Sequence, residues 1–172
     1  PGQFVINKNR FSLFDSVVVN GQTYIASGSG NGFGVIDPLN RRLGSSSVAP
    51  TSVEIEVNKP MHSIIKVEGA FSDGTNKDTD YITRIHFFAN SPTVILQHTF
   101  INRNPGSRIA YSALEAMYLN LKTTLANPTV KIATDLSWRQ KSLSGAGSMK
   151  IVGREHPPGR ALRNYKPAEI LY

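Results

Sequence analysis

Cysteine is absent from the 172 residues of the chain. The protein therefore has no disulfide, no thiolate metal site and no cysteine nucleophile. The sequence also has no apolar run of about eighteen residues, the length that a transmembrane helix needs. The one Asn-x-Thr sequence, at Asn127, has proline in its middle position, so the chain has no acceptor site for N-glycosylation.

Short motifs of common catalytic and nucleotide-binding sites are missing too. The sequence contains neither Gly-x-Ser-x-Gly, which marks a serine nucleophile, nor His-Glu-x-x-His, which marks a zinc protease. A glycine-rich run, Gly28–Gly34, is followed by strand-like residues and not by the helix whose N-terminus would hold a phosphate. We therefore assign no catalytic residue, no nucleotide site, no metal site and no cofactor from these patterns.

Charge is spread unevenly over a composition that is typical of a globular domain, with 40% hydrophobic and 18% charged residues. Residues 1–135 hold twelve basic against ten acidic residues, or +2, and residues 136–172 hold seven against two, or +5. No aromatic platform accompanies the basic segment, so we expect a solvated tail and no specific nucleic acid partner. We predict a β-barrel domain over residues 1–135 and a basic extended tail or linker over residues 136–172, with room for one short strand.

Alternating apolar and polar side chains, interrupted by turn residues, indicate β-strands along most of the chain. Asn20-Gly21 lies between two such runs, Ser12–Val19 and Gln22–Ala26, and predicts a tight hairpin because both residues accept a positive φ. In Ser52–Val57, valine and isoleucine alternate with two glutamates, which predicts a half-buried strand with its glutamates facing outward.

Further strands extend this pattern to residue 152. The segment Ser112–Lys122 contains good helix formers, but its all-β context favours a strand. The other predicted strands are Gly34–Asp37, Arg41–Gly44, His62–Phe71, Tyr81–Ala89, Thr93–Asn102, Thr129–Thr134 and Met149–Val152. About nine or ten short strands predict an all-β protein, a single antiparallel β-barrel or sandwich-like barrel with an extended Pro/Gly-rich C-terminal tail.

Five side chains are candidates for binding a glycan: Tyr81, Arg84, His86, His98 and Trp138. Arg84 and His86 are two residues apart on one predicted strand, so they share a face, where a cation and an imidazole suit a sugar acid. His86 and His98 lie on the two strands of one predicted hairpin. They face each other if its loop is centred on Ser91–Thr93, but a one-residue slip puts them on opposite faces.

Structural alternatives exist for these polar groups. Without a third ligand, the two histidines are more simply explained as partly buried side chains bonded to their neighbours, and Arg84, Tyr81 and Glu68 as a solvated barrel face. The polar segment Asp73–Asp80 is predicted to be a loop. Its three aspartates offer oxygen ligands for Ca²⁺, although their spacing does not match an EF-hand.

The order of the strand segments is distinctive. It comprises Arg10–Val17, Val53–Glu56, His62–Gly69, Tyr81–Pro92 and Leu96–Asn102. This order resembles the N-terminal β domain of the exo-rhamnogalacturonan lyase-like family over about residues 4–135. The resemblance implies a RIFT-type barrel, the kind described in riboflavin synthase and translation factors, which in that family precedes a large (α/α) toroid. Cleavage is expected to depend on the toroid, so the resemblance implies no catalytic residue in this chain.

Three hypotheses about function follow. The first is a non-catalytic β-barrel module of a secreted, polysaccharide-active protein, which supports a catalytic domain of the same parent chain or binds acidic glycan; the start at Pro1 fits a piece of a longer protein. The second is a structural subunit that forms homo-oligomers in a surface filament or virion-type assembly. The third is a small polysaccharide lyase in which Arg84 holds the uronate and His86 or His98 takes the proton.

Overall fold

The computed structural model describes residues 2–37, 39–101 and 116–126 in full, and the backbone of four further strands over residues 129–134, 137–142, 150–152 and 169–171. It divides into two compact units, Pro1–Thr124 and Leu125–Tyr172, which we describe separately. The described residues form strands, turns and loops but no helix, and so nothing among them is a helix that could cross a membrane. The predicted all-β class is confirmed.

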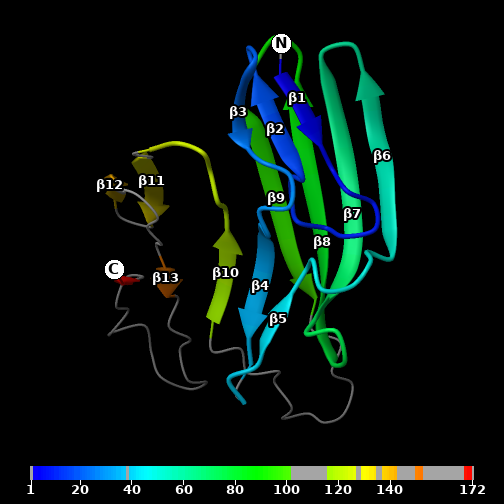
Figure 1. The fold of residues 1–172 in the computed structure, drawn as a ribbon, viewed down its shortest axis with the longest axis vertical. Coiled ribbons are helices and arrows are strands. Elements are labelled where there is room, and N and C mark those ends of the chain that lie inside the picture. Colours follow the sequence, from blue (N-terminus) through cyan, green and yellow to red (C-terminus); the bar gives the residue numbers. More distant parts are fainter. Residues whose placement is uncertain are drawn as a thin grey trace. The chain divides into compact units, whose positions relative to one another are not determined.

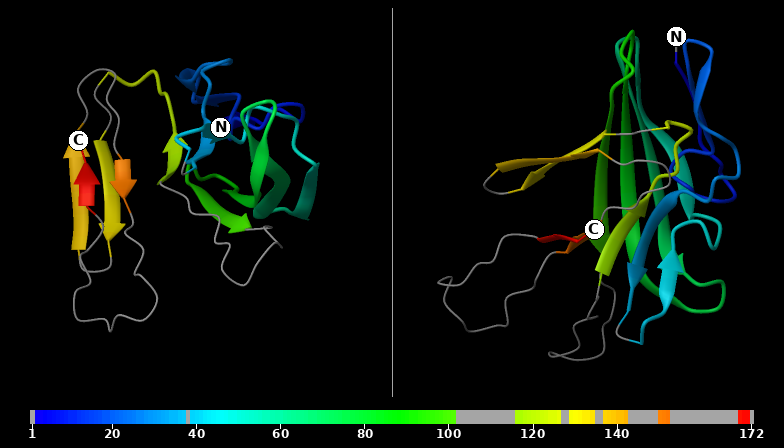
Figure 2. Two further views of the ribbon diagram at one scale, coloured as in Figure 1. Left: turned by 90° about the horizontal axis from the view of Figure 1, so that it is seen from below. Right: turned by 60° about the vertical axis from the view of Figure 1, so that its left-hand side comes forward.

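The first unit consists of two antiparallel sheets (Figure 1). The small sheet has the order β1-β2-β3, and the large one has the order β10-β4-β5-β7-β8-β9, with β6 also paired to β7. The large sheet curls into a half-barrel, and the small sheet lies across part of its concave face (Figure 2). The strands are β1 (Gly2–Val5), β2 (Ser16–Val19), β3 (Gln22–Ile25), β4 (Gly32–Ile36), β5 (Arg42–Gly44), β6 (Ser52–Lys59), β7 (His62–Ser72), β8 (Lys77–Phe88), β9 (Val94–Ile101) and β10 (Ala116–Asn120).

The hairpin predicted at Asn20-Gly21 forms, and a second chain reversal joins β4 to β5. Asn20 and Gly21 join β2 to β3 with φ values of 51° and 80°, the conformation that a type I′ turn requires. Between β4 and β5, the carboxylate of Asp37 accepts hydrogen bonds from the backbone N–H groups of Leu39 and Arg41, at 3.0 and 2.8 Å. These bonds stabilise the short connection between the two strands.

The core fills the space between the two sheets. Phe87 of β8 contacts Phe4 and Phe14 of the N-terminal segment, with ring centroids 5.2 and 6.4 Å apart. Burial of these apolar rings, at roughly 25 cal/mol per Å² of apolar surface, is the main force that holds the small sheet against the large one. The buried core residues are Phe11, Leu13, Phe14, Val17, Ile25, Val35, Leu43, Val67, Phe71, Tyr81 and Ile85.

Asn31, which is fully buried, ties the segment after β10 to the rest of the unit. Its side-chain carbonyl accepts a hydrogen bond from the backbone N–H of Lys122, and its amide donates to the carbonyl of the same residue at 3.3 Å. Two residues later, the backbone N–H of Thr124 donates to the carbonyl of Tyr24 in β3 at 2.9 Å. The segment therefore bridges the two sheets.

Replacing Asn31 with alanine is expected to lower the free energy of unfolding by about 1–3 kcal/mol, because it leaves backbone groups of Lys122 without their partner. Chemical denaturation followed by circular dichroism measures this change. Asn120→Ala is the matched control, since Asn120 is exposed and its amide makes only a 3.5 Å bond to the carbonyl of Gly30. Equal stability losses in the two variants would contradict the bridging role of Asn31.

The strand β6 departs from the predicted alternation. A β-bulge lies between Ile55 and Val57, which pair with the consecutive residues Ile65 and Ile64 of β7. Val57 therefore turns to the outward face, and Ile55 is 65% exposed at the rim of the sheet. The prediction that the three apolar residues of this strand share one buried face is therefore wrong, because Val57 faces outward and Ile55 is exposed.

Two other predicted segments are confirmed in part. The strand predicted over Ser112–Lys122 exists as β10, and residues 112–115 lie outside the described part of the chain. The loop predicted over Asp73–Asp80 is shorter than expected, because β8 begins at Lys77. Asp78 and Asp80 are therefore strand residues.

The second unit contains two pairs of antiparallel strands. The first pair is β11 (Thr129–Thr134) with β12 (Ser137–Ser142), and the second is β13 (Lys150–Val152) with β14 (Glu169–Leu171). The predicted end of the barrel domain at residue 135 falls between β11 and β12. Among the described residues, β12, β13 and β14 fall within 136–172, where the sequence predicts one short strand at Met149–Val152.

Candidate functional site

Strand β8 separates the candidate residues onto two faces. Tyr81, Thr83 and Ile85 point inward and are buried, whereas Arg84 and His86 point outward and are partly exposed. The prediction that Arg84 and His86 share a face is confirmed. The period of two along the strand, whose register with β9 is uninterrupted, produces this separation.

His86 and His98 lie on opposite faces of the sheet. In the β8–β9 hairpin His98 pairs with Thr83 and His86 pairs with Ile95. The hairpin is centred between Asn90 and Ser91, and Asn90 supports the turn with a φ of 59°. The register differs by three residues from the one in which the two histidines face each other, so they lie on opposite faces and the facing pair does not form.

Tyr81 is a core residue and is only 1% exposed. Its ring stacks near Phe11 and Phe71, with centroids 5.7 and 5.0 Å away, and its hydroxyl donates to the carbonyl of Ser45 at 3.4 Å. The ring lies directly over Gly69, where an added Cβ would approach the phenol oxygen to 2.5 Å. Burial raises the pKa of Tyr81. A glycan in solution has no access to this side chain.

His98 is enclosed by aromatic rings on the inner face. Its ring stacks on Phe33 at a centroid distance of 3.7 Å and meets Phe100 edge-on at 4.5 Å. Nδ1 lies 2.7 Å from the hydroxyl of Thr83, and Nε2 is buried without a hydrogen-bond partner among the described residues. Burial lowers the pKa of His98 to about 4, so the ring is neutral at neutral pH.

Arg84 is held by a carboxylate on the outward face. Its Nε and Nη2 atoms donate to the two carboxylate oxygens of Glu56, at 2.7 and 2.8 Å. This two-bonded pair raises the pKa of Arg84 and lowers the pKa of Glu56. The bulge in β6 supplies the partner, because Glu56 is the additional residue that has no opposite number in β7.

Lys66 is paired as well, one strand away from Arg84. Its ammonium group lies 2.8 Å from a carboxylate oxygen of Glu68 and 3.0 Å from one of Glu54. The bonds to Glu68 and then to Glu54 raise the pKa of Lys66. Arg84 and Lys66 are thus paired with three carboxylates on this face.

His62 joins His86 on the outward face, a contact that sequence reasoning missed. Its Nε2 atom lies 3.1 Å from Nδ1 of His86, and its ring stacks on Phe88 at 4.9 Å and 8°. Nε2 of His86 in turn lies 3.3 Å from the side-chain carbonyl of Gln97. The predicted strand ends did not show it, because pairing His62 with Ala89 would put the two histidines on opposite faces, whereas in the structure His62 pairs with Phe88.

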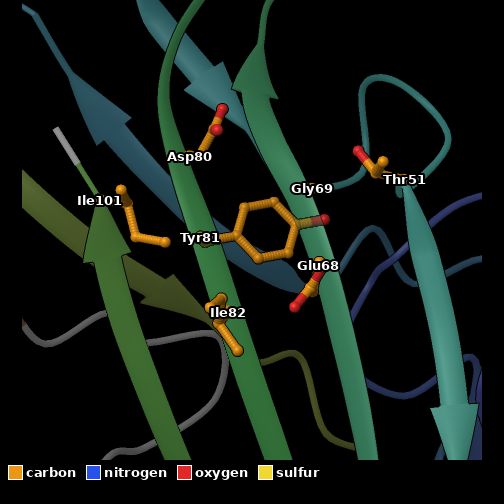
Figure 3. A pocket seen from close by; sticks show the side chains of 7 residues that line it. All are labelled: Thr51, Glu68, Gly69, Asp80, Tyr81, Ile82 and Ile101. Atoms are coloured by element: carbon orange, nitrogen blue, oxygen red, sulfur yellow. The ribbon is translucent and has the colours of Figure 1, made fainter. Parts of the chain in front are cut away.

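A small hollow of about 110 Å³ lies on the same sheet, near the end of β7 (Figure 3). Its lining residues are Thr51, Glu68, Gly69, Asp80, Tyr81, Ile82 and Ile101. The volume is below the roughly 300–1,000 Å³ of small-molecule sites. Glu68 and Asp80 bring two carboxylates to it from neighbouring strands (Figure 3), which disfavours an anionic sugar.

The remaining candidates concern Ca²⁺ and Trp138. Asp73 accepts hydrogen bonds from the backbone N–H of Thr75 and from the side chain and backbone of Asn76, which lower its pKa to about 2. In the part of the chain that the structure describes, no three His, Asp or Glu side chains gather as a metal site. Trp138 belongs to β12, but its side chain lies outside the described residues.

Comparisons of this chain with family models, with curated proteins and with solved structures give no match. The resemblance to the rhamnogalacturonan lyase-like family therefore stays a prediction from the order of strand segments. The assignment of function depends on the residues themselves.

Proposed function

We propose that this chain is a non-catalytic β module of a secreted, polysaccharide-active protein and that it supports a catalytic domain of the same parent chain. The observation that carries the proposal is the engagement of the candidate binding groups in the fold. Tyr81 is a core side chain, His98 is packed against aromatic rings on the inner face, and the guanidinium of Arg84 is bound by Glu56. The resemblance of the strand order to the rhamnogalacturonan lyase-like family supplies the polysaccharide context.

Electrostatics favour the supporting role over the binding of an acidic glycan. On the outward face a uronate would have to displace Glu56 from Arg84, and it would meet the carboxylates that surround Lys66. The small-lyase hypothesis has a further difficulty, because it needs Arg84, His86 and His98 at one sugar residue. The sheet separates His98 from the other two.

We expect no saturable heat when rhamnogalacturonan or polygalacturonate is titrated into the protein at low ionic strength. Arg84→Ala should leave the titration unchanged, and Glu56→Gln, which releases the guanidinium, serves as the matched control. Isothermal titration calorimetry makes the measurement. Heat that appears with the unaltered protein and disappears in Arg84→Ala would replace the supporting role with glycan binding.

The supporting role itself is tested with the separately produced catalytic domain of the parent protein. The two should co-elute on size exclusion, and the catalytic domain should unfold at a higher temperature in the presence of the module. Independent elution with unchanged unfolding temperatures would contradict a supporting role.

An assembly subunit is the second candidate, and the edge strands favour it. The edge strand β6 carries a bulge, three charged residues and a following Pro60, the features that keep strands from pairing with other chains. The edge strand β9 (Val94–Ile101) has no charge, no proline and no bulge, and its outer edge has no partner among the described strands. Light scattering across a concentration series tests this candidate. A mass that rises in the unaltered protein but not in Ile95→Lys supports it, and a monomer throughout removes it.

A further inference from the structure

The outward face of β7 and β8 places two imidazole nitrogens at the spacing of a shared ligand. His62 pairs with Phe88, and His86 pairs with Ile64, so the two histidines are diagonal neighbours on adjacent strands. Nε2 of His62 and Nδ1 of His86 are 3.1 Å apart, and the ring planes are inclined by only 17°. Two nitrogens bound to one tetrahedral metal at 2.0–2.1 Å are about 3.3 Å apart. The observed spacing is close to that value.

The surroundings of the pair determine which nitrogens are available. The side-chain carbonyl of Gln97 lies 3.3 Å from Nε2 of His86, and a carbonyl only accepts hydrogen bonds. With the amide of Gln97 in this orientation, Nε2 of His86 is a donor, and Nδ1 of His86 accepts a hydrogen bond from Nε2 of His62, a bond that a shared ion would replace. Metal-binding histidines typically have this outer partner, a carbonyl or carboxylate that receives the second ring N–H.

Packing restricts the movement of both rings. His62 stacks on Phe88 at 4.9 Å, and both strands belong to the centre of the large sheet. The row of His86 holds the apolar residues Val57, Ile64 and Ile95, and the row of His62 holds Phe88 and Lys59. Side chains that are already held in place lose less conformational entropy when they bind an ion.

We propose that His62 and His86 form a two-histidine site for a divalent transition-metal ion of the Zn²⁺, Ni²⁺ and Cu²⁺ class. His62 binds through Nε2, with its own proton on Nδ1, and His86 binds through Nδ1. The other coordination positions are left to water or to a ligand brought by a partner. Imidazole suits these metals, and affinity follows the order Cu²⁺ above Ni²⁺ and Zn²⁺.

The charges around the pair do not oppose a cation. Glu56 is near enough to interact electrostatically with His86, and Arg84, the nearest cation on β8, is bound to that carboxylate. Lys59 pairs with His62 across β6 and is exposed, so its charge is screened by solvent.

Titration of CuSO₄, NiCl₂ and ZnCl₂ into the full chain at pH 7.5 tests the proposal. We expect one Cu²⁺ per chain and an unfolding temperature that rises with each metal and returns with EDTA. His62→Phe, which keeps a ring against Phe88, and His86→Ala should each lower the Cu²⁺ affinity at least tenfold. Electron paramagnetic resonance of bound Cu²⁺ should show two imidazole nitrogens.

The chain has four histidines, and His156→Ala is the matched control because it leaves the pair intact. Circular dichroism establishes that each variant is folded. Binding that survives in His62→Phe and His86→Ala would overturn the proposal. So would binding that is lost in His156→Ala, because the ion would then belong to the C-terminal segment.

Discussion

Tyr81→Ala is expected to lower the free energy of unfolding by about 3–5 kcal/mol, the range for removing a large aromatic side chain from a core. Tyr81 is 1% exposed and lies within ring-contact distance of Phe11, Phe71 and His98, so its loss leaves a cavity between the sheets. Chemical denaturation followed by circular dichroism measures the change.

Tyr81→Phe separates the ring from its hydroxyl. The hydroxyl donates one long bond, 3.4 Å to the carbonyl of Ser45, so this variant should lose no more than about 1 kcal/mol. A small loss in Tyr81→Ala would contradict the assignment of this residue to the core and would reopen its role as an exposed glycan-binding ring.

Stability should fall by about 2 kcal/mol between pH 6.5 and pH 4 because of His98. Its pKa is about 4 in the folded protein and near 6.5 in the unfolded chain, so in this interval the unfolded chain binds the additional proton. The contribution is complete above pH 6.5, decreases as the pH falls toward 4, and is constant below. The figure allows for screening at the partly exposed ring. Urea denaturation at a series of pH values measures it.

A double variant isolates the effect of His98 from the titration of carboxylates. His98→Phe keeps an aromatic ring against Phe33, and Thr83→Val removes the hydroxyl that would otherwise lose its partner. Lowered carboxylate pKa values, such as that of Asp73 near 2, contribute to both proteins and cancel in the difference. A double variant with the same pH dependence as the unaltered protein would show that His98 is not buried in a neutral form.

Strand identity was predictable from the sequence because alternation is local. The Asn20-Gly21 turn and the shared face of Arg84 and His86 each depend on residues within a few positions of one another. The all-β class follows from such signals repeated along the chain. None of them specifies how one strand is aligned with the next.

Register was harder to predict, and it decides the site. Moving the centre of the β8–β9 hairpin from Pro92 to the Asn90–Ser91 bond sends His98 inward and leaves His86 outside. The bulge at Glu56 likewise depends on a mismatch with β7 that alternation within β6 does not reveal. Asn31 was missed for the same reason, because its partner Lys122 is 91 positions away.

Strands β5 and β6 pair with different parts of β7, so the segment that connects β5 to β6 sets their relative positions. β5 meets β7 at Ser72, β6 meets it from His62 to Glu68, and residues 45–51 run from one to the other. Ser45 is fully buried at the start of this run, where its hydroxyl donates to the carbonyl of Phe11 and accepts from the N–H of Phe33. This short connection thereby fixes the positions of the N-terminal segment at Phe11, of β4 and β5, and of β6 relative to one another. An insertion in residues 45–51 would shift all three parts, whereas an insertion at the exposed Leu39, between β4 and β5, would extend into solvent.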